Sequence, residues 1–537
     1  MLKFDSTIYP YPSRRNVMYA KNGMVATGSP LAAQAGLEIL KKGGNAIDAA
    51  IATAAALTVV EPTGNGIGGD GFAILSVNNK IYGLNASGPS PKLLEAQDLL
   101  NKGLKEMPKY GLIPVTVPGI PKAWAELSKK FGKLPLSEVV APAVKLAREG
   151  YAVPVNVAKL WKKAAVNFGK ESGEEFKYWF ETFTKDGKCP EIGDVVRLPD
   201  HADTLEMIGD TYADAFYKGE LADKIDAFSK KYNGYIRKDD LEEFEAEWVE
   251  PISVKYHGYD VYELPPNGHG ISALMALNIL DRFQFEARET VRSYHTMIEA
   301  MKLAFVDVQK YVADPRFMKV TVEQLLSKAY AEDRAKLIGN KAIMPEAGDP
   351  FCGGTVYLAA ADNEGNMISY IQSNYMGFGS GMVVPGTGIA LHNRGNNFNL
   401  DLESANCVGP GKKPYHTIIP GFLGKDGKAV GPFGVMGGFM QPQGHVQVVT
   451  NTVDFLMNPQ SALDAPRWQW VGKKNIELEH GVPEHIAYEL AAMGHDIKVL
   501  HDPLMMGRGE IIWRMENGVL VGGTEPRTDG HIALYLY

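Results

Sequence analysis

The chain has 537 residues, of which 45% are hydrophobic and 22% are charged. This composition is typical of a folded globular protein and excludes a chain that is disordered throughout. The 55 Lys and Arg against 63 Asp and Glu give a formal net charge of −8 without a basic block, which argues against a nucleic-acid partner.

The cysteines and the N-terminal residues argue against further classes. Cys189, Cys352 and Cys407 form no C-x-x-C pair, so we expect idle thiols rather than a disulfide framework or a thiolate zinc site. The first residues carry proline, arginine and aspartate where a signal peptide needs a continuous apolar run, and no later stretch holds the roughly 18 consecutive apolar residues of a membrane span. We therefore expect a cytoplasmic protein without a membrane partner.

In chain order, the first expected elements are two helices and a hairpin. Ser29 is a suitable N-cap and Pro30 suits the first turn of a helix that stops at a Gly-Gly pair. Residues 45–60 are small or apolar on most faces and indicate a second, buried helix. Residues 71–86 have strand character on both sides of an Asn-Asn turn, which predicts a β-hairpin.

The middle of the chain is expected to be helical. Residues 117–153 predict short helices broken by prolines, and residues 155–250 indicate a charged outer lobe in which 169–180 forms a solvated face. Residues 263–280 join a Pro/Gly turn to a helix, and residues 295–317 predict an amphipathic helix that ends before a proline.

The last third changes to strand character. Residues 355–362 and 367–374 flank the turn Asn-Glu-Gly-Asn and predict a second hairpin. A helix is expected near 437–456. Further strands are expected in 381–393, 416–438 and 509–526. Helices outside antiparallel strands predict a layered α+β architecture.

The stretch Gly66–Gly71, "GIGGDG", matches the G-x-G-x-x-G pattern of dinucleotide folds. A helix precedes it and a strand follows, which is the reverse of the order that places a pyrophosphate on a helix N-terminus. We interpret it as a tight turn in which backbones approach closely. P-loop, H-E-x-x-H and G-x-S-x-G motifs do not occur.

Thr355 opens the first strand of the second hairpin directly after Gly353–Gly354. If its hydroxyl attacks the Gly354 carbonyl, an N→O acyl shift and hydrolysis free Thr355 as a new N-terminus. An α-amine has a reference pKa of about 7.7–8.0, so it can act as base for the hydroxyl of the same residue. The alternative, an ordinary strand threonine after a Gly-Gly turn, is the commoner outcome for the local sequence alone.

Acyl chemistry at Thr355 also needs hydrogen-bond donors for an oxyanion. Gly437 and Gly438 carry no side chain that would obstruct their backbone N–H groups. One such donor is worth about 3–4 kcal/mol of transition-state stabilisation. With these glycines, the candidate parts of an amide hydrolase are complete.

These residues, with several longer segments, resemble the γ-glutamyltransferase (glutathione hydrolase) family of N-terminal nucleophile hydrolases. The segments occur in the family's order: 23–52, "GIGGDGF", "GTVYLAAADNEGN", "DAPRW" and "GGTEPRTDG". The resemblance implies a four-layer αββα sandwich with an added helical lobe. It also implies a cut between Gly354 and Thr355, giving a large fragment 1–354 and a small fragment 355–537 that stay associated in one intertwined core.

The same resemblance assigns the reacting groups. Thr355 matches the family's nucleophile, and Ser373 stands where the family has a hydroxyl bonded to that nucleophile. Gly437 and Gly438 match the oxyanion pair. No metal and no organic cofactor is implied, and a dimer of cut chains stays open.

The substrate-binding positions depart from the family's pattern. Ser87 stands in place of the arginine that holds the α-carboxylate, and Asn397 replaces the acidic residue that receives the α-amino group. His416–Thr417 replaces a pair of serines, and Tyr375 replaces an asparagine. Arg394 is the remaining fixed cation that could hold a carboxylate in a bidentate manner, unless it is a surface arginine.

We therefore expect a self-processing N-terminal-threonine amide hydrolase that acts through an acyl-enzyme on a small carboxylate-bearing amide. An oxamate-type amidohydrolase or a side-chain amide acylase is one alternative to γ-glutamyl transfer. The other alternative is an unprocessed, non-catalytic relative that serves as a binding module.

Overall fold

Two seven-stranded antiparallel sheets lie at the centre of the protein. The computed structural model describes residues 5, 10–11, 15–345 and 354–536. Sheet I has the order β21 (His531–Tyr535), β2 (Gly23–Thr27), β10 (Gly354–Asp362), β11 (Met367–Tyr375), β3 (Asp70–Val77), β4 (Lys80–Ala86), β7 (Glu247–Val249). Sheet II has the order β1 (Met18–Ala20), β20 (Leu520–Thr524), β19 (Arg508–Arg514), β15 (Lys428–Met436), β14 (Gly421–Lys425), β9 (Tyr259–Glu263), β8 (Ile252–Tyr256).

Strand β10 shows how the two sheets stack. Val356 and Leu358 belong to the hydrophobic cluster beneath the helices of sheet I. Tyr357 and Ala359 belong to a second cluster, which sheet I shares with residues of sheet II. Because successive side chains of a strand point to opposite faces, β10 is buried on both sides, by helices on one and by a sheet on the other.

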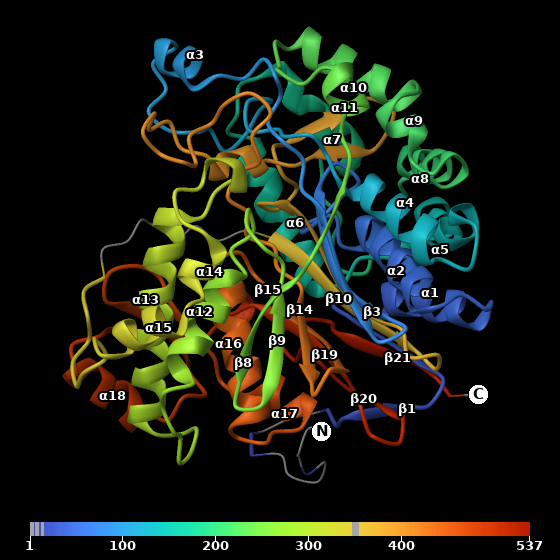
Figure 1. Cartoon of the computed structure of the whole chain (residues 1–537). Helices are drawn as coiled ribbons and strands as arrows, with labels where there is room; N and C mark the ends of the chain where they lie inside the picture. The colour runs from blue at the N-terminus through green and yellow to red at the C-terminus, as the bar shows by residue number, and fades with distance from the viewer. Residues whose placement is uncertain (1–4, 6–9, 12–14, 346–353, 537) are drawn as a thin grey trace.

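Helices cover the outer face of each sheet, as Figure 1 shows. Sheet I is covered by α1 (Pro30–Lys41), α2 (Ala46–Val60) and α4 (Ile120–Phe131), and α5 (Leu136–Glu149) packs on α2. Sheet II is covered by α12 (Ile271–Leu280), α16 (Met440–Val453) and α17 (Pro459–Asp464), and α13 (Val291–Tyr311) packs on α12. The layers therefore run helix, sheet, sheet, helix, and the expected four-layer αββα class is confirmed.

Helix α2 lies at the centre of the layer over sheet I, and its sequence explains its position. All its residues are buried, as expected for a helix that is small and apolar all round. Asn45 accepts hydrogen bonds from the first turn while Asp48 accepts from the backbone of Asn45, which completes a capping box. The helix is thus fixed at its N-terminus and packs directly on β10 and β11.

The helices between residues 155 and 242 extend this layer at one end of the molecule (Figure 1). Trp161 and Phe168 of the first of them belong to the same hydrophobic cluster as α2, so the lobe has no separate core. The lobe comprises α6 (Val155–Phe168), α7 (Lys177–Phe183), α8 (Pro199–Thr211), α9 (Asp214–Tyr217), α10 (Glu220–Lys231) and α11 (Lys238–Glu242). The run 169–180, expected to be solvated, contains buried Phe176 and Trp179, so that expectation is wrong for these aromatics.

Smaller elements complete the chain. They are α3 (Ala96–Asn101), α14 (Val322–Leu325), α15 (Lys328–Ala335), α18 (Glu484–Ala492), β5 (Tyr151–Ala152), β6 (Val195–Val196), β12 (Met382–Val384), β13 (Ile389–Leu391), β16 (Trp468–Trp470), β17 (Asn475–Glu479) and β18 (Asp496–Leu500). Cys189 and Cys407 are free thiols, whereas Cys352 and Gly353 lie outside the described residues. Of the helices described, none combines the length and the apolar character needed to cross a bilayer.

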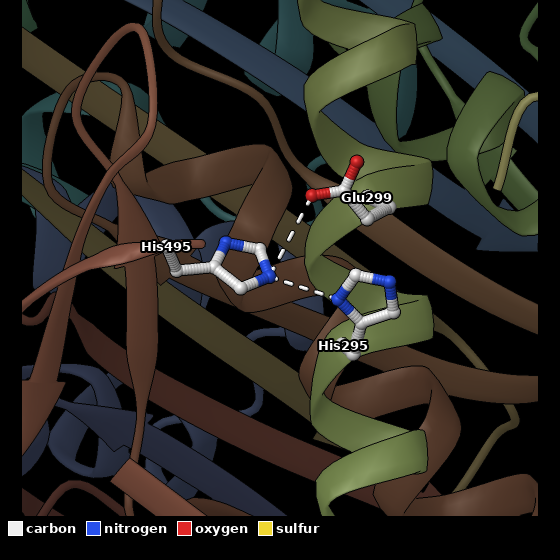
Figure 2. A group of neighbouring side chains, drawn as sticks. All are labelled: His295, Glu299 and His495. Atoms are coloured by element: carbon white, nitrogen blue, oxygen red, sulfur yellow. Dashed lines mark hydrogen bonds and ion pairs between the residues drawn. The ribbon is translucent and has the colours of Figure 1, made fainter. Parts of the chain in front are cut away.

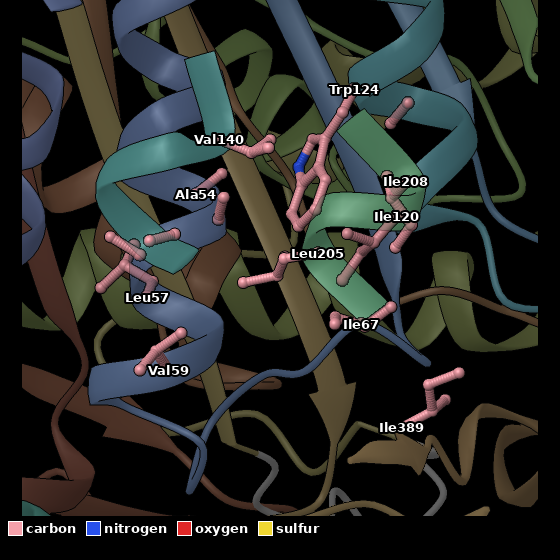
Figure 3. Packing of buried hydrophobic residues seen from close by; sticks show 14 of the residues in the cluster. Ala54, Leu57, Val59, Ile67, Ile120, Trp124, Val140, Leu205, Ile208 and Ile389 are labelled. Carbon is pink, nitrogen blue, oxygen red and sulfur yellow. The ribbon is translucent and has the colours of Figure 1, made fainter. Parts of the chain in front are cut away.

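Trp124 provides a test of this packing. Its side chain is fully buried among residues of α2, α5 and α8, as Figure 3 shows. We expect Trp124→Ala to lower the free energy of unfolding by about 3–5 kcal/mol, because the surrounding helices cannot fill the volume of an indole. Thermal unfolding measures the loss. Tyr488→Ala, at a side chain that is 73% exposed, is the control and should shift the midpoint little. Equal midpoints for the two variants would contradict the packing described.

Candidate active site

Thr355 lies at the start of β10, where the register with β11 is irregular. Gly354 pairs with Tyr375 and Val356 pairs with Gln372, so two residues of β11 lie opposite Thr355 alone. A bulge of this kind turns side chains out of the regular alternation and is frequent next to active sites. The irregularity therefore coincides with the expected nucleophile.

The hydroxyl of Thr355 is buried and bonded to a second hydroxyl. Thr355 is 1% exposed, and its Oγ1 lies 3.0 Å from the Oγ of Ser373, with either atom able to donate. The Ser373 Oγ also accepts the backbone N–H of Tyr375 at 2.8 Å. The pairing of the two hydroxyls that the family resemblance implies is thus present, and it restrains the Thr355 side chain to one orientation.

The glycine loop Gly66–Gly71 packs behind these residues. It follows α2 and enters β3, so the helix-then-strand order expected from the sequence is observed. A Cβ atom added to Gly69 would lie 2.4 Å from the carbonyl oxygen of Ser373, and one added to Gly68 would lie 2.4 Å from that of Ala390. The glycines are therefore required by close backbone approach, which supports the tight-turn interpretation.

Gly437 and Gly438 follow the end of β15 and precede α16. Their φ angles are 139° and 61°, in the region that favours glycine. Their carbonyls accept the N–H groups of Met440 and Gln441, each at 3.1 Å, whereas their own N–H groups donate to no residue of the described chain. These two amides are therefore available as oxyanion donors.

A small cavity connects Thr355, the expected nucleophile, with this end of β15. It is lined by Gly28, Glu61, Thr355, Val356, Tyr357, Met436, Arg508 and Glu510. Since Met436 directly precedes Gly437, the Thr355 side chain and the glycine pair adjoin the same region. The sequence did not indicate Glu61 or Arg508, which form an ion pair of 2.7 Å and line the same cavity as Thr355.

Most of the expected substrate-binding residues form one buried cluster. The Nη1 of Arg394 donates to the Thr417 Oγ1 at 2.7 Å, and its guanidinium lies 4.5 Å above the centre of the Tyr375 ring. His416 Nε2 donates to an oxygen of Asp70 at 2.8 Å, and the same oxygen lies 3.6 Å from Arg394 Nε. Arg394 is fully buried, so the alternative of a surface arginine is excluded.

Asp70 is the residue that the sequence analysis missed in this cluster. Burial acts to raise its pKa, but electrostatic interaction and hydrogen bonds with the rings of His392 and His416 hold that pKa below its usual range. Burial and the nearby Arg394 charge lower the pKa of His416 to about 3. At neutral pH Asp70 is therefore anionic and His416 neutral, so the positive charge of Arg394 is compensated within the protein.

Ser87 and Asn397 lie at the margin of the cluster. The Ser87 hydroxyl bonds to the side chain of Asn85 at 2.7 Å, while the next residue, Gly88, donates its N–H to Asp70 at 3.3 Å. Asn397 belongs to the same 3₁₀ turn as Arg394, η3 (Arg394–Asn397), but its side-chain amide nitrogen is buried without a hydrogen-bond partner among the described residues. The structure therefore does not connect the Asn397 side chain to Arg394.

A second group of titratable residues has the composition of a metal site. His295 and Glu299 of α13 and His495, before β18, place their ligand atoms within 4.8 Å of one another, as Figure 2 shows. His495 Nε2 lies 2.8 Å from His295 Nδ1 and 3.7 Å from a Glu299 oxygen. Whether these three residues hold a metal depends on the hydrogen bonds made by their other side-chain nitrogen and oxygen atoms, because those bonds decide which atoms carry a proton.

Lys302 provides those outer contacts. Its ammonium donates to Glu299 at 2.7 Å and to His495 Nδ1, which must accept, at 3.2 Å. His495 Nε2–H then donates to His295 Nδ1, and His295 Nε2–H donates to the Gly339 carbonyl at 3.1 Å. A metal on His495 Nε2 would require a proton on Nδ1, facing the ammonium. The donor set therefore suits the lysine better than a metal ion.

N-terminal nucleophile hydrolases place the hydroxyl of the reacting residue at the start of a central strand in an αββα sandwich, close to backbone N–H groups that have no other acceptor. Thr355 and the Gly437–Gly438 pair have this arrangement. The chain belongs to the gamma-glutamyltranspeptidase family, whose family model matches residues 32–535. The expected class, a self-processing amide hydrolase, is thereby confirmed.

Individual relatives agree with this class. The chain is 36% identical over 522 residues to the glutathione hydrolase-like YwrD proenzyme of Bacillus subtilis, covering 94% of this chain and 97% of that protein. It is 32% identical over 529 residues to the oxamate amidohydrolase proenzyme of Klebsiella pneumoniae, covering 96% and 98%. A crystal structure described as cephalosporin acylase from Bacillus halodurans is 57% identical, covers 99% of each chain and superimposes with a TM-score of 0.96.

The roles of Thr355 and of the Gly354–Thr355 bond stay predictions, and one variant series tests both. We expect Thr355→Ala to yield a single uncut chain without hydrolase activity, since cleavage and turnover require the same hydroxyl. Thr355→Ser should keep part of the self-cleavage and part of the hydrolase activity. Denaturing electrophoresis and N-terminal sequencing of the smaller wild-type fragment, expected to begin Thr-Val-Tyr-Leu, are the measurements. Two fragments from the Ala variant would exclude Thr355 as the nucleophile.

The hydrogen bonds of Lys302 lead to a prediction about metals. Overnight dialysis against EDTA should leave both activity and the thermal midpoint unchanged, because the ammonium already compensates Glu299. Added Zn²⁺ should not raise the midpoint either, whereas a ligand of the folded state would do so by mass action. A zinc-dependent increase that is lost in His495→Ala would show that the cluster binds metal.

Proposed function

We propose that this enzyme hydrolyses a small carboxylate-bearing amide that is not a γ-glutamyl compound. The observation that carries the proposal is the internal charge balance of the cluster around Arg394 and Asp70. A substrate with an α-carboxylate and an α-ammonium would meet a buried group there in which the charges of Asp70 and Arg394 oppose each other. Differential binding therefore cannot favour the γ-glutamyl transition state.

The proposed reaction uses groups of the protein alone. After the cut before Thr355, its Oγ1 attacks the amide carbonyl carbon while its proton passes to the α-amine. The N–H groups of Gly437 and Gly438 stabilise the oxyanion, and the amine leaves with the transferred proton. Water then hydrolyses the ester on Thr355 and regenerates the hydroxyl. Ser373 keeps the attacking oxygen oriented through its 3.0 Å hydrogen bond.

The nature of the leaving group distinguishes the remaining alternatives. The names of two relatives, an oxamate amidohydrolase and a cephalosporin acylase, support hydrolysis of small or side-chain amides over γ-glutamyl transfer. A cytoplasmic location, a dimer of cut chains and the boundaries of the two fragments stay predictions.

A substrate comparison tests the proposal. We expect wild-type kcat/KM for glutathione and for γ-glutamyl-4-nitroanilide to be at least about a hundredfold below that of the best amide in a panel, a difference of roughly 2.7 kcal/mol. The panel should contain oxamate and anilides of dicarboxylic acids, with release of ammonia or 4-nitroaniline as readout. A kcat/KM for glutathione equal to that for the best amide would refute the proposal and show that the enzyme acts on γ-glutamyl compounds.

A further inference from the structure

Glu510 is a buried carboxyl group that the proposed reaction does not use. It belongs to β19, and its side chain is 2% exposed. Ile512, two residues further along the same strand, belongs to the hydrophobic cluster between the two sheets, so Glu510 faces that layer as well. Its Oε2 atom is buried and has no hydrogen-bond partner among the described residues. A buried polar atom in this state requires an explanation.

Glu510 and Thr355 line the same small cavity, which has a volume of about 10 Å³. This is close to the space that one water molecule needs, and a buried water is usually held by about three polar partners. The wall of the cavity also includes the ion pair of Glu61 and Arg508. The cavity therefore fits a single water between the two carboxyl groups and the expected nucleophile.

The surroundings of Glu510 keep its carboxyl group protonated at neutral pH. Burial raises its pKa well above the usual range, and the charge of Glu525 acts in the same direction. Contacts with Thr524 and with the backbone of Glu525, and the charge of Arg15, lower the pKa by less than burial raises it. A protonated carboxyl group can donate a hydrogen bond, which a carboxylate cannot do.

Glu61, the second carboxyl group of the cavity, has a cation beside it. Burial raises the pKa of Glu61 and the charge of Asp529 acts in the same direction, but the ion pair with Arg508 at 2.7 Å favours the carboxylate. The two carboxyl groups thus offer a water different hydrogen bonds. Glu510 can donate to its oxygen, and Glu61 can accept one of its hydrogens.

Self-cleavage needs a proton transfer that substrate turnover does not need. In the uncut chain the nitrogen of Thr355 belongs to a peptide bond, so the α-amine that serves as base after the cut does not yet exist. The acyl shift must nevertheless remove the proton of the Thr355 hydroxyl and supply a proton to the Thr355 nitrogen. Because both atoms belong to one residue, a single water beside them can make both transfers.

We propose that Glu510 is a positioning residue for self-cleavage, in which it donates its O–H to a water in this cavity and that water relays the proton. Thr355 Oγ1 forms a bond to the Gly354 carbonyl carbon and gives its proton to the water. The water gives one of its own protons to the Thr355 nitrogen as the C–N bond breaks, and its other hydrogen stays bonded to Glu61. The water and both carboxyl groups end unchanged. The proposal rests on the predicted cut before Thr355 and on no particular substrate.

Two substitutions at Glu510 separate this role from packing. Glu510→Gln keeps the shape of the side chain and an N–H donor, whereas Glu510→Leu keeps a similar volume and removes the hydrogen bond. Ile512→Ala is the matched control, because Ile512 lies on the same face of β19 but does not line the cavity. The full-length chains are made by cell-free translation, and electrophoresis follows their conversion into two fragments with time. Thermal midpoints and kcat/KM for the best amide of the substrate panel are measured on the processed proteins.

At pH 7 we expect Glu510→Leu to cut at least about tenfold more slowly than wild type and Glu510→Gln to stay within about threefold. The processed Leu variant should keep kcat/KM within about threefold of wild type, because the freed α-amine then accepts the proton. Ile512→Ala should cut at the wild-type rate in spite of a lower thermal midpoint. The O–H donor of Glu510 is present below its pKa and lost above it, so the ratio of the wild-type to the Gln cutting rate should fall as the pH rises.

Other outcomes would overturn the role of Glu510. Cutting of the Leu variant at the wild-type rate would show that Glu510 has no part in the step. An equal loss in the Gln and Leu variants would show that a carboxylate accepts the proton, contrary to the proposal. Equal losses of cutting and of turnover in the Leu variant would indicate a general effect on the fold. N-terminal sequencing separates the remaining failure, since a small fragment that does not begin at Thr355 would refute the predicted cut itself.

Discussion

The hydrogen bonding of β10 on both of its edges is the constraint on which the rest of the site depends. The strand pairs with β2 on one side and β11 on the other, in the middle of sheet I. Its alternate side chains are packed by α2 on one face and by sheet II on the other. Thr355 stands at the end of this strand, so its position is determined by a strand that is paired on both edges and packed on both faces.

Electrostatic balance characterises the buried cluster around Arg394. Around Arg394 the charges are buried: the lowered pKa of Asp70 keeps this residue anionic opposite Arg394, and the lowered pKa of His416 keeps this ring neutral. A buried, balanced group of this kind keeps a fixed arrangement.

Local patterns in the sequence predicted the elements that carry the chemistry. The Asn-Glu-Gly-Asn turn predicts the hairpin of β10 and β11, which the structure contains. The family resemblance implies the contact between Ser373 and Thr355. The glycine loop was interpreted correctly because the order of helix and strand is visible in the sequence.

Residues that meet only through tertiary contacts could not be predicted. Trp179 was assigned to a solvated run because its neighbours are charged, yet its ring packs 5.1 Å from that of Phe378, about 200 positions later in the chain. In the sequence Asp70 is only one residue of the turn motif Gly66–Gly71, and no local pattern connects it with its partners His392 and His416.

The strand order of sheet I has a consequence for the life of the protein after processing. Strands from both sides of the Gly354–Thr355 bond alternate there, with β2 between β21 and β10, and β11 beside β3. If this bond is cut as predicted after the sheet has formed, the two pieces hold each other through the backbone hydrogen bonds of β10 with β2 and of β11 with β3. If such a molecule unfolds, its pieces diffuse apart, and recovery becomes a second-order encounter that slows with dilution, although the original chain folded at a rate independent of concentration. The lifetime of the working enzyme is then set by how slowly it unfolds.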